Sequence, residues 1–104
     1  MDKIVFITGA SSGIGAGCAR KFASQGASLI LNARNVNKLS ALKEELEKQY
    51  GAKIYLLPFD VRDRKAATSA LESLPKEWQS IDILVNNAGL VIGTDKAVSY
   101  THLR

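Results

Sequence analysis

The feature that most constrains the fold is a glycine-rich segment, residues 8–15 (TGASSGIG), that joins two apolar stretches of different periodicity. Residues 4–7 are consecutively apolar, which is typical of a strand covered on both faces. After the segment, Ile14, Cys18 and Phe22 recur every four residues and predict one apolar face of a helix. The segment is therefore expected to be a tight turn from a buried strand into a helix.

The same alternation continues along the chain. Further short apolar runs occupy residues 29–31, 54–57 and 83–85, and helical patterns lie between them. Gly26 and Gly51 suit helix C-termini, Asp63 suits the N-cap of the third helix, and Pro75 should break or kink that helix. The order β-α-β-α-β-α-β predicts an α/β fold, a Rossmann-type doubly wound parallel sheet truncated after about four strands. The fourth strand would then be an open edge.

Composition and charge argue against several other classes of protein. The chain has 104 residues with a formal charge of +4, and acidic residues are interspersed with basic ones, as in residues 43–48. That pattern is typical of solvated helix faces and not of a nucleic-acid-binding stripe. No apolar run approaches the ~20 residues that span a bilayer, and residues 1–5 lack the features of a secretory signal. Cys18 is the only cysteine, so no disulfide or zinc pair is expected. We therefore expect a cytoplasmic protein that binds neither nucleic acid nor membrane.

The glycine spacing in residues 9–15 predicts a phosphate-binding loop. Gly9 permits a sharp turn, Gly13 lets the backbone approach a pyrophosphate, and Gly15 lets the helix pack closely on the sheet. The helix N-terminus would present free N–H groups and a positive dipole to the phosphates. A competing interpretation is that the glycines serve backbone freedom only. The loop residues predicted to bind a cofactor are Gly9, Ala10, Ser11, Ser12, Gly13, Ile14 and Gly15.

This segment resembles the cofactor motif of the short-chain dehydrogenases/reductases. Three more features of that family occur in order: Arg34 after the second strand, Asp60-Val61 after the third, and residues 86–89 (NNAG) after the fourth. The resemblance covers residues 1–96. It implies an NADP(H)-binding N-terminal half of an oxidoreductase that transfers hydride between NADP and an alcohol or carbonyl substrate.

The end of the second strand indicates which nicotinamide cofactor is bound. Ala33 occupies the place where NAD-preferring family members carry Asp, and Arg34 follows it directly. A guanidinium can bind a phosphate through two charge-assisted hydrogen bonds. We therefore predict NADP(H), with Asn35 and Ser11 helping to hold the 2′-phosphate end. The alternative is that Arg34 is only a solvated surface charge.

The remaining site residues follow from the resemblance alone. It implies that the Asp60 carboxylate meets the adenine amino group, with the Val61 backbone beside the ring. The alternative for Asp60 is a structural cap of the loop before the third helix. The resemblance also implies a turn whose backbone lines the two riboses, with Asn87 additionally tying neighbouring strands together. The residues of that turn are Asn86, Asn87, Ala88 and Gly89.

No catalytic residue is assigned within these 104 residues. The family's Ser, Tyr and Lys, the last two spaced Tyr-x-x-x-Lys, lie well beyond the fourth strand, so the chain by itself is expected to be inactive. Tyr100 and Arg104 imitate that spacing only eleven positions after Gly89, and Arg is a poor substitute for a Lys. Residues 98–104 match the conceptual translation of a common transposase-based sequencing adapter. We therefore expect residues 97–104 to be a non-native tail on an authentic segment 1–96.

Only resemblance to known families indicates the class of substrate. Residues 74–78 (LPKEW) and 81–90 resemble the branch of the family that contains bacterial NADP-dependent 3-hydroxy acid dehydrogenases. A 3-oxoacyl carrier-protein reductase and a non-catalytic NADP-sensing module are the alternatives. The family implies a small-molecule substrate and a homodimer or homotetramer for the full-length protein.

Overall fold

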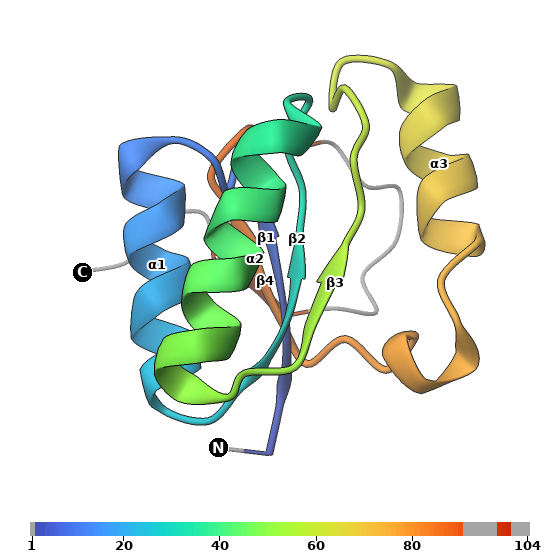
Figure 1. Cartoon of the computed structure of the whole chain (residues 1–104). Coiled ribbons are helices and arrows are strands. Elements are labelled where there is room, and N and C mark those ends of the chain that lie inside the picture. Colours follow the sequence, from blue (N-terminus) through green and yellow to red (C-terminus); the bar gives the residue numbers. More distant parts are fainter. Residues whose placement is uncertain (1, 91–97, 101–104) are drawn as a thin grey trace.

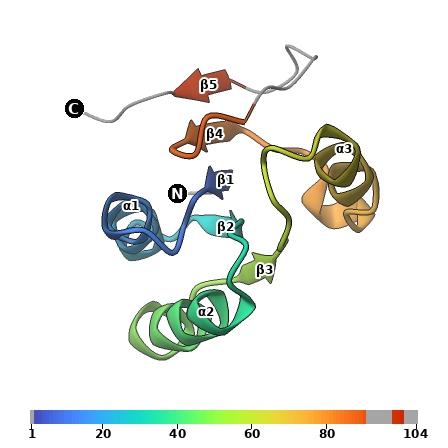
Figure 2. The same ribbon diagram turned by 90° about the horizontal axis from the view of Figure 1, so that it is seen from above.

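The computed structural model describes residues 2–90 and 98–100, and it contains one parallel β-sheet with helices on both faces (Figures 1 and 2). The strands lie side by side in the order β3-β2-β1-β4-β5. They are β1 (Ile4–Thr8), β2 (Ser28–Leu31), β3 (Ile54–Leu56), β4 (Ile83–Asn86) and β5 (Val98–Tyr100). The helices are α1 (Gly13–Ser24), α2 (Val36–Tyr50), α3 (Arg64–Glu72) and the 3₁₀-helix η1 (Lys76–Trp78).

The sheet separates two apolar cores. Seen from above, α1 and α2 cover one face and α3 covers the other (Figure 2). Val5 and Ile7 belong to the core on the α1/α2 side, whereas Phe6 belongs to the opposite core. Because successive side chains of a strand point to opposite faces, a continuously apolar strand supplies both cores. The predicted Rossmann-type α/β fold is confirmed by this arrangement.

Side-chain caps begin the three α-helices. The side chains of Ser12, Asn35 and Asp63 accept hydrogen bonds from backbone N–H groups in the first turns of α1, α2 and α3. Gly51 ends α2 in the left-handed conformation, with φ of 64°. The predicted cap at Asp63 and C-terminus at Gly51 are confirmed. Among the described residues, no helix is long and apolar enough to cross a membrane.

The third helical segment is shorter than its apolar pattern suggested. Helix α3 ends at Glu72, and Pro75 precedes η1 with φ of −55°. Pro75 has no N–H group to continue the helical hydrogen bonds, so Leu74 reaches the core from the connection after α3 and Trp78 from η1. The expected break at Pro75 is confirmed.

The four predicted strands are present, but the expectation that β4 is an open edge is wrong. Strand β5 pairs with β4 in parallel, with Ile83 opposite Val98. An unpaired strand edge presents a row of N–H and C=O groups to which an extended segment can add. Strand β5 lies within the segment predicted to be a non-native tail, and its origin remains a prediction.

The N-terminal half-turn of α1 lies against the turn that leaves β1. A Cβ atom at Gly15 would overlap the carbonyl oxygen of Gly9 and would lie 2.9 Å from the Cα of Ala10. Both neighbours are backbone atoms, so neither can move aside as a side chain would. Gly17, in the same helix, has open space where its Cβ would be. The close approach predicted for Gly15 is therefore present.

These two glycines provide a matched pair of substitutions. We expect Gly15→Ala to lower the free energy of unfolding by about 3 kcal/mol, because the added methyl forces α1 away from the sheet. Gly17→Ala should raise it by roughly 0.5–1 kcal/mol, because Ala loses less conformational freedom in a helix. Urea denaturation of the two variants measures both changes. A Gly15→Ala variant as stable as the wild type would contradict the close packing.

Candidate functional site

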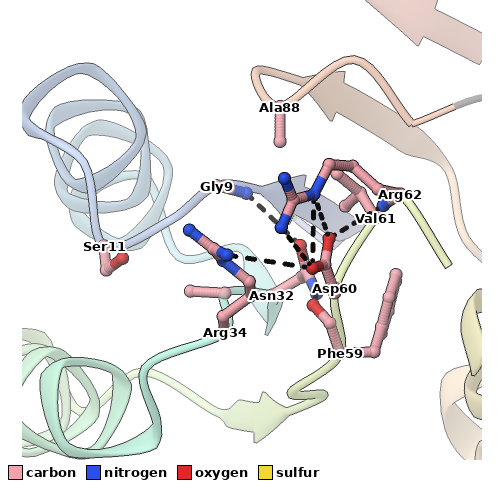
Figure 3. Close-up of a pocket in the computed structure, with 10 residues that line it drawn as sticks. Gly9, Ser11, Asn32, Arg34, Phe59, Asp60, Val61, Arg62 and Ala88 are labelled. Carbon is pink, nitrogen blue, oxygen red and sulfur yellow. Dashed lines mark hydrogen bonds and ion pairs between the residues drawn. The ribbon is translucent and has the colours of Figure 1, made fainter.

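The strands β1 to β4 end at one edge of the sheet, where the loops that follow them enclose a crevice (Figure 3). Strand β1 lies between β2 and β4, so the chain order reverses there, and such a switch point is where doubly wound sheets bind ligands. The crevice has a volume of about 350 Å³. Its lining residues are Gly9, Ser11, Asn32, Ala33, Arg34, Phe59, Asp60, Val61, Arg62 and Ala88.

The glycine-rich loop adopts the predicted turn. Gly9 has φ of 63°, and a Cβ there would lie 2.9 Å from the side chain of Asn87. The Ser12 hydroxyl donates to the Gly9 carbonyl at 2.9 Å and accepts from the Gly15 N–H at 3.0 Å. Gly13 has no atom within 4 Å of its would-be Cβ, so its backbone is open to a ligand. The first N–H groups of a helix have no acceptor within the helix, and Ser12 takes up only that of Gly15. Such a helix end suits an anion, and anion binding here remains a prediction.

The loop after β4 is hydrogen-bonded to the glycine-rich loop. The Asn87 amide donates to the Gly9 carbonyl at 3.2 Å and to the Ser12 hydroxyl at 2.9 Å. The Ala88 N–H donates to the Thr8 hydroxyl at 3.0 Å. These bonds join the ends of β1 and β4, as expected for Asn87.

The side chain of Asn86 is hydrogen-bonded within the loop that follows β4. Its side-chain oxygen accepts from the Leu90 N–H at 2.7 Å and from the Thr8 hydroxyl at 3.1 Å, and its amide donates to the Leu90 carbonyl at 2.6 Å. These bonds close the turn that contains Gly89, where φ is 75°. The side chain of Asn86 is thus structural, and a contact of its backbone with a ribose remains a prediction.

A buried asparagine that the sequence patterns did not predict as a site residue connects three segments of the site. Asn32 is 1% exposed, and its amide donates to the carbonyls of Leu57 and Phe59, each at 3.1 Å. Its side-chain oxygen accepts from the Gly9 N–H at 3.4 Å, and its carbonyl accepts from the Ala10 N–H at 2.7 Å. A buried amide with complementary partners fixes the glycine-rich loop relative to the loop after β3. A polar residue ending an apolar strand was the only sequence signal for it.

The surface beyond the end of β2 is basic. An open pocket of about 490 Å³ is lined by Ser11, Arg34, Asn35 and Lys38. The Arg34 side chain is 70% exposed there. Asn35 accepts from the Lys38 N–H at 3.2 Å as the N-cap of α2, so its side-chain oxygen is already used. The structure thus brings the three predicted residues together and adds Lys38, one helical turn along.

Two guanidinium groups lie beside Asp60 (Figure 3). The Arg62 side chain donates to both carboxylate oxygens, with Nη2 2.9 Å from Oδ2 and Nε 3.1 Å from Oδ1. The Arg62 N–H also donates to Oδ1 at 2.9 Å, and the Arg34 Nη1 lies 3.8 Å from Oδ2. The side-chain and backbone hydrogen bonds from Arg62 lower the pKa of Asp60 to about 2. Arg62 was not singled out from the sequence, although the Asp-x-Arg spacing could have indicated it.

The two interpretations of Asp60 are compatible. The Arg62 N–H donates to the Asp60 carboxylate, and the Asp63 N–H donates to the Asp60 backbone carbonyl at 2.9 Å. Asp60 therefore organises the loop before α3. The carboxylate also lines the crevice, and a carboxylate offers about four acceptor positions. A contact with adenine therefore remains a prediction.

Not every predicted site residue faces the two pockets. Six of the predicted residues line the crevice, and Asn35 lines the basic pocket. Ala10 and Gly15 are buried beneath the loop, and Ile14 is 74% exposed on the first turn of α1. The predicted residues outside both linings are Ala10, Ser12, Gly13, Ile14, Gly15, Asn86, Asn87 and Gly89.

Comparison with known proteins decides the family. A model of the short chain dehydrogenase family matches residues 3–102. The chain belongs to the short chain dehydrogenase family. The NADP-dependent 3-hydroxy acid dehydrogenase of Schizosaccharomyces pombe is 45% identical over 97 residues, and the match covers 92% of this chain and 38% of that protein. The Escherichia coli enzyme of the same name is 46% identical over 94 residues, with 90% and 36% covered.

Solved structures agree with this assignment. Serine dehydrogenase from Escherichia coli superimposes with a TM-score of 0.75 at 46% identity, covering 86% of this chain and 39% of that chain. L-Sorbose reductase from Gluconobacter frateurii, in complex with NADPH and L-sorbose, has a TM-score of 0.78 at 38% identity, covering 85% and 34%. The chain thus spans little more than a third of the length of these relatives.

The buried amide of Asn32 should be essential for stability. We expect Asn32→Asp to lower the free energy of unfolding by about 3 kcal/mol, because a carboxylate cannot donate to the carbonyls of Leu57 and Phe59. Asn35→Asp is the matched control, since Asp caps a helix as well as Asn does, and it should change stability by less than about 0.5 kcal/mol. Equal destabilisation by the two changes in urea denaturation would contradict the role of Asn32.

The titration of Asp60 should depend on Arg62. We expect Arg62→Gln to raise the pKa of Asp60 from about 2 toward its ordinary value, because the side-chain bonds are lost while the backbone bond remains. A depressed pKa favours folding above the unfolded-state value of about 3.9, and that contribution is lost as the pH falls toward 2. Carboxyl ¹³C NMR titration measures the shift, with Asp60→Asn identifying the signal. An unchanged Asp60 pKa in Arg62→Gln would contradict this pairing.

Proposed function

We propose that residues 1–96 are the NADP(H)-binding N-terminal half of a dehydrogenase that transfers hydride between NADP and a 3-hydroxy acid. The observation that carries the proposal is the basic pocket formed by Ser11, Arg34, Asn35 and Lys38 beside the crevice. Buried Ala33 stands where an acidic residue would exclude a 2′-phosphate. Family membership and the NADP-dependent relatives support the same cofactor.

The residues of the crevice fit a phosphorylated dinucleotide. Gly9 and Gly13 leave room for the backbone to approach the pyrophosphate, and the N-terminus of α1 offers N–H groups and a positive dipole. Arg34 would bind the 2′-phosphate through a planar, two-pronged contact, and Lys38 would add a second positive charge. Asp60 and Val61 would border the adenine ring. NADP(H), when bound, supplies or accepts the hydride.

The decisive test compares the two cofactors. We expect the intact gene product to bind NADPH more tightly than NADH, and Arg34→Gln to weaken NADPH binding about 10- to 100-fold with little effect on NADH, because charge-assisted hydrogen bonds to phosphate are lost. Fluorescence titration measures both affinities. Arg20→Gln is the control, since Arg20 pairs with Glu45 between α1 and α2, away from the crevice. Equal affinities that Arg34→Gln leaves unchanged would exclude this cofactor assignment.

We propose that the substrate pocket lies in the part of the family's proteins that this chain does not span. We infer a small-molecule 3-hydroxy acid because the relatives named above act on such acids by their names. The 104-residue chain alone should not turn over substrate, because the resemblance to the family implies that its catalytic Ser, Tyr and Lys lie well beyond the fourth strand. Assays of the intact gene product with L-serine, 3-hydroxypropionate and an acetoacetyl thioester separate the alternatives. Activity on the thioester alone would favour a 3-oxoacyl carrier-protein reductase.

We propose that residues 97–104 are encoded by a sequencing adapter and are not native to the protein. Separately, we propose that the intact protein is a cytoplasmic homodimer or homotetramer. The nucleotide sequence tests the first statement directly, because codons other than those of the adapter at residues 98–104 would refute it. Analytical ultracentrifugation of the intact gene product tests the second.

A further inference from the structure

Asp60 places a negative charge next to the residue proposed to bind the 2′-phosphate. The Arg34 Nη1 is 3.8 Å from Oδ2 of Asp60, too far for a hydrogen bond but close enough for attraction. A carboxylate at this position has two effects on phosphate binding. It draws the guanidinium of Arg34 toward itself, and it repels the phosphate that Arg34 would bind.

Arg62 is the nearer partner of that carboxylate. It donates three side-chain bonds and one backbone bond to Asp60, at 2.9 to 3.3 Å, from a position only two residues along the chain. The short chain connection keeps the pair together at little entropic cost, whereas Arg34 approaches from the separate loop after β2. Figure 3 shows the two guanidinium groups on different sides of the carboxylate. Asp60 is therefore committed to Arg62, and Arg34 stays only loosely associated with it.

We propose that Arg62 is a specificity-determining residue for the phosphorylated cofactor, because it occupies Asp60 and thereby leaves Arg34 available to the 2′-phosphate. This inference rests on the proposed NADP(H) function and adds a residue that acts through charge balance. Arg34, Arg62 and Asp60 all line the crevice, so their three formal charges sum to +1 there. Without Arg62, Asp60 would take Arg34 as its partner and the net charge would fall by one.

The solvent exposure of the two arginine side chains limits how much Arg62 can change the cofactor preference. The side chains of Arg34 and Arg62 are 70% and 75% exposed, and ion pairs between exposed groups are weak. We therefore expect removal of Arg62 to lower the preference for NADPH over NADH by about two- to five-fold. The change should be smaller than that caused by Arg34→Gln, because Arg34 touches the phosphate and Arg62 does not.

A double-mutant cycle tests the proposal in the intact gene product. NADPH and NADH affinities are measured for the wild type, Arg62→Gln, Asp60→Asn and the double variant. We expect Arg62→Gln to lower the NADPH:NADH preference in the wild type but not in the Asp60→Asn background, where no carboxylate competes for Arg34. Arg62→Lys should keep most of the preference, since it retains a cation beside Asp60, and Arg20→Gln should leave it unchanged.

The outcomes separate this inference from the proposed function. A wild type without NADPH preference, or one whose preference survives Arg34→Gln, overturns the proposed cofactor. With that preference intact, an Arg62→Gln variant that weakens both cofactors equally overturns the inference and makes Arg62 a general adenosine contact. A loss of preference of the same size in the Asp60→Asn background also overturns it, because Arg62 would then act on the phosphate directly. Thermal melting of each variant shows that the protein compared is folded.

Discussion

The structure depends on the direct contact between the start of α1 and the turn that leaves β1. Gly15 brings the helix so close that a single methyl group would overlap the carbonyl of Gly9. This contact sets the direction of α1 and hence of the N–H groups at its first turn. The remaining loops are then tied to this turn, through Asn87 from the end of β4 and through Asn32 from the end of β2.

The crevice that results combines two kinds of recognition. The turn after β1 offers backbone groups and a helix dipole, which suit any pyrophosphate. The loops after β2 and β3 offer side-chain charges, with Arg34 and Arg62 on either side of Asp60. The proposal assigns the pyrophosphate to the first and the distinction between cofactors with and without a 2′-phosphate to the second.

The sequence predicted the parts that depend on local physics. Glycine spacing, apolar periodicity and capping residues located the strands, the glycine-rich turn, the C-terminus of α2 and the start of α3. Residues whose importance comes from contacts between distant segments were missed. In the sequence Asn32 is simply a polar residue after a strand, and nothing there shows that its amide donates to the carbonyls of Leu57 and Phe59. In the sequence Arg62 is one of many charged residues, and only the structure shows that it pairs with Asp60 in the crevice. Lys38 likewise gains its place at the site only because α2 begins beside Arg34. The pairing of β5 with β4 could not be predicted either, because edge addition carries no periodic signal of its own.

The hydrogen bonds of Asn32 have a consequence for ligand binding. One side chain holds the loops after β1 and β3 at once, and it is buried beneath both of them. The part of the crevice proposed to bind phosphates and the part proposed to border adenine are thereby joined through one buried side chain. If a dinucleotide binds as proposed, less of its interaction energy should be lost in immobilising these loops.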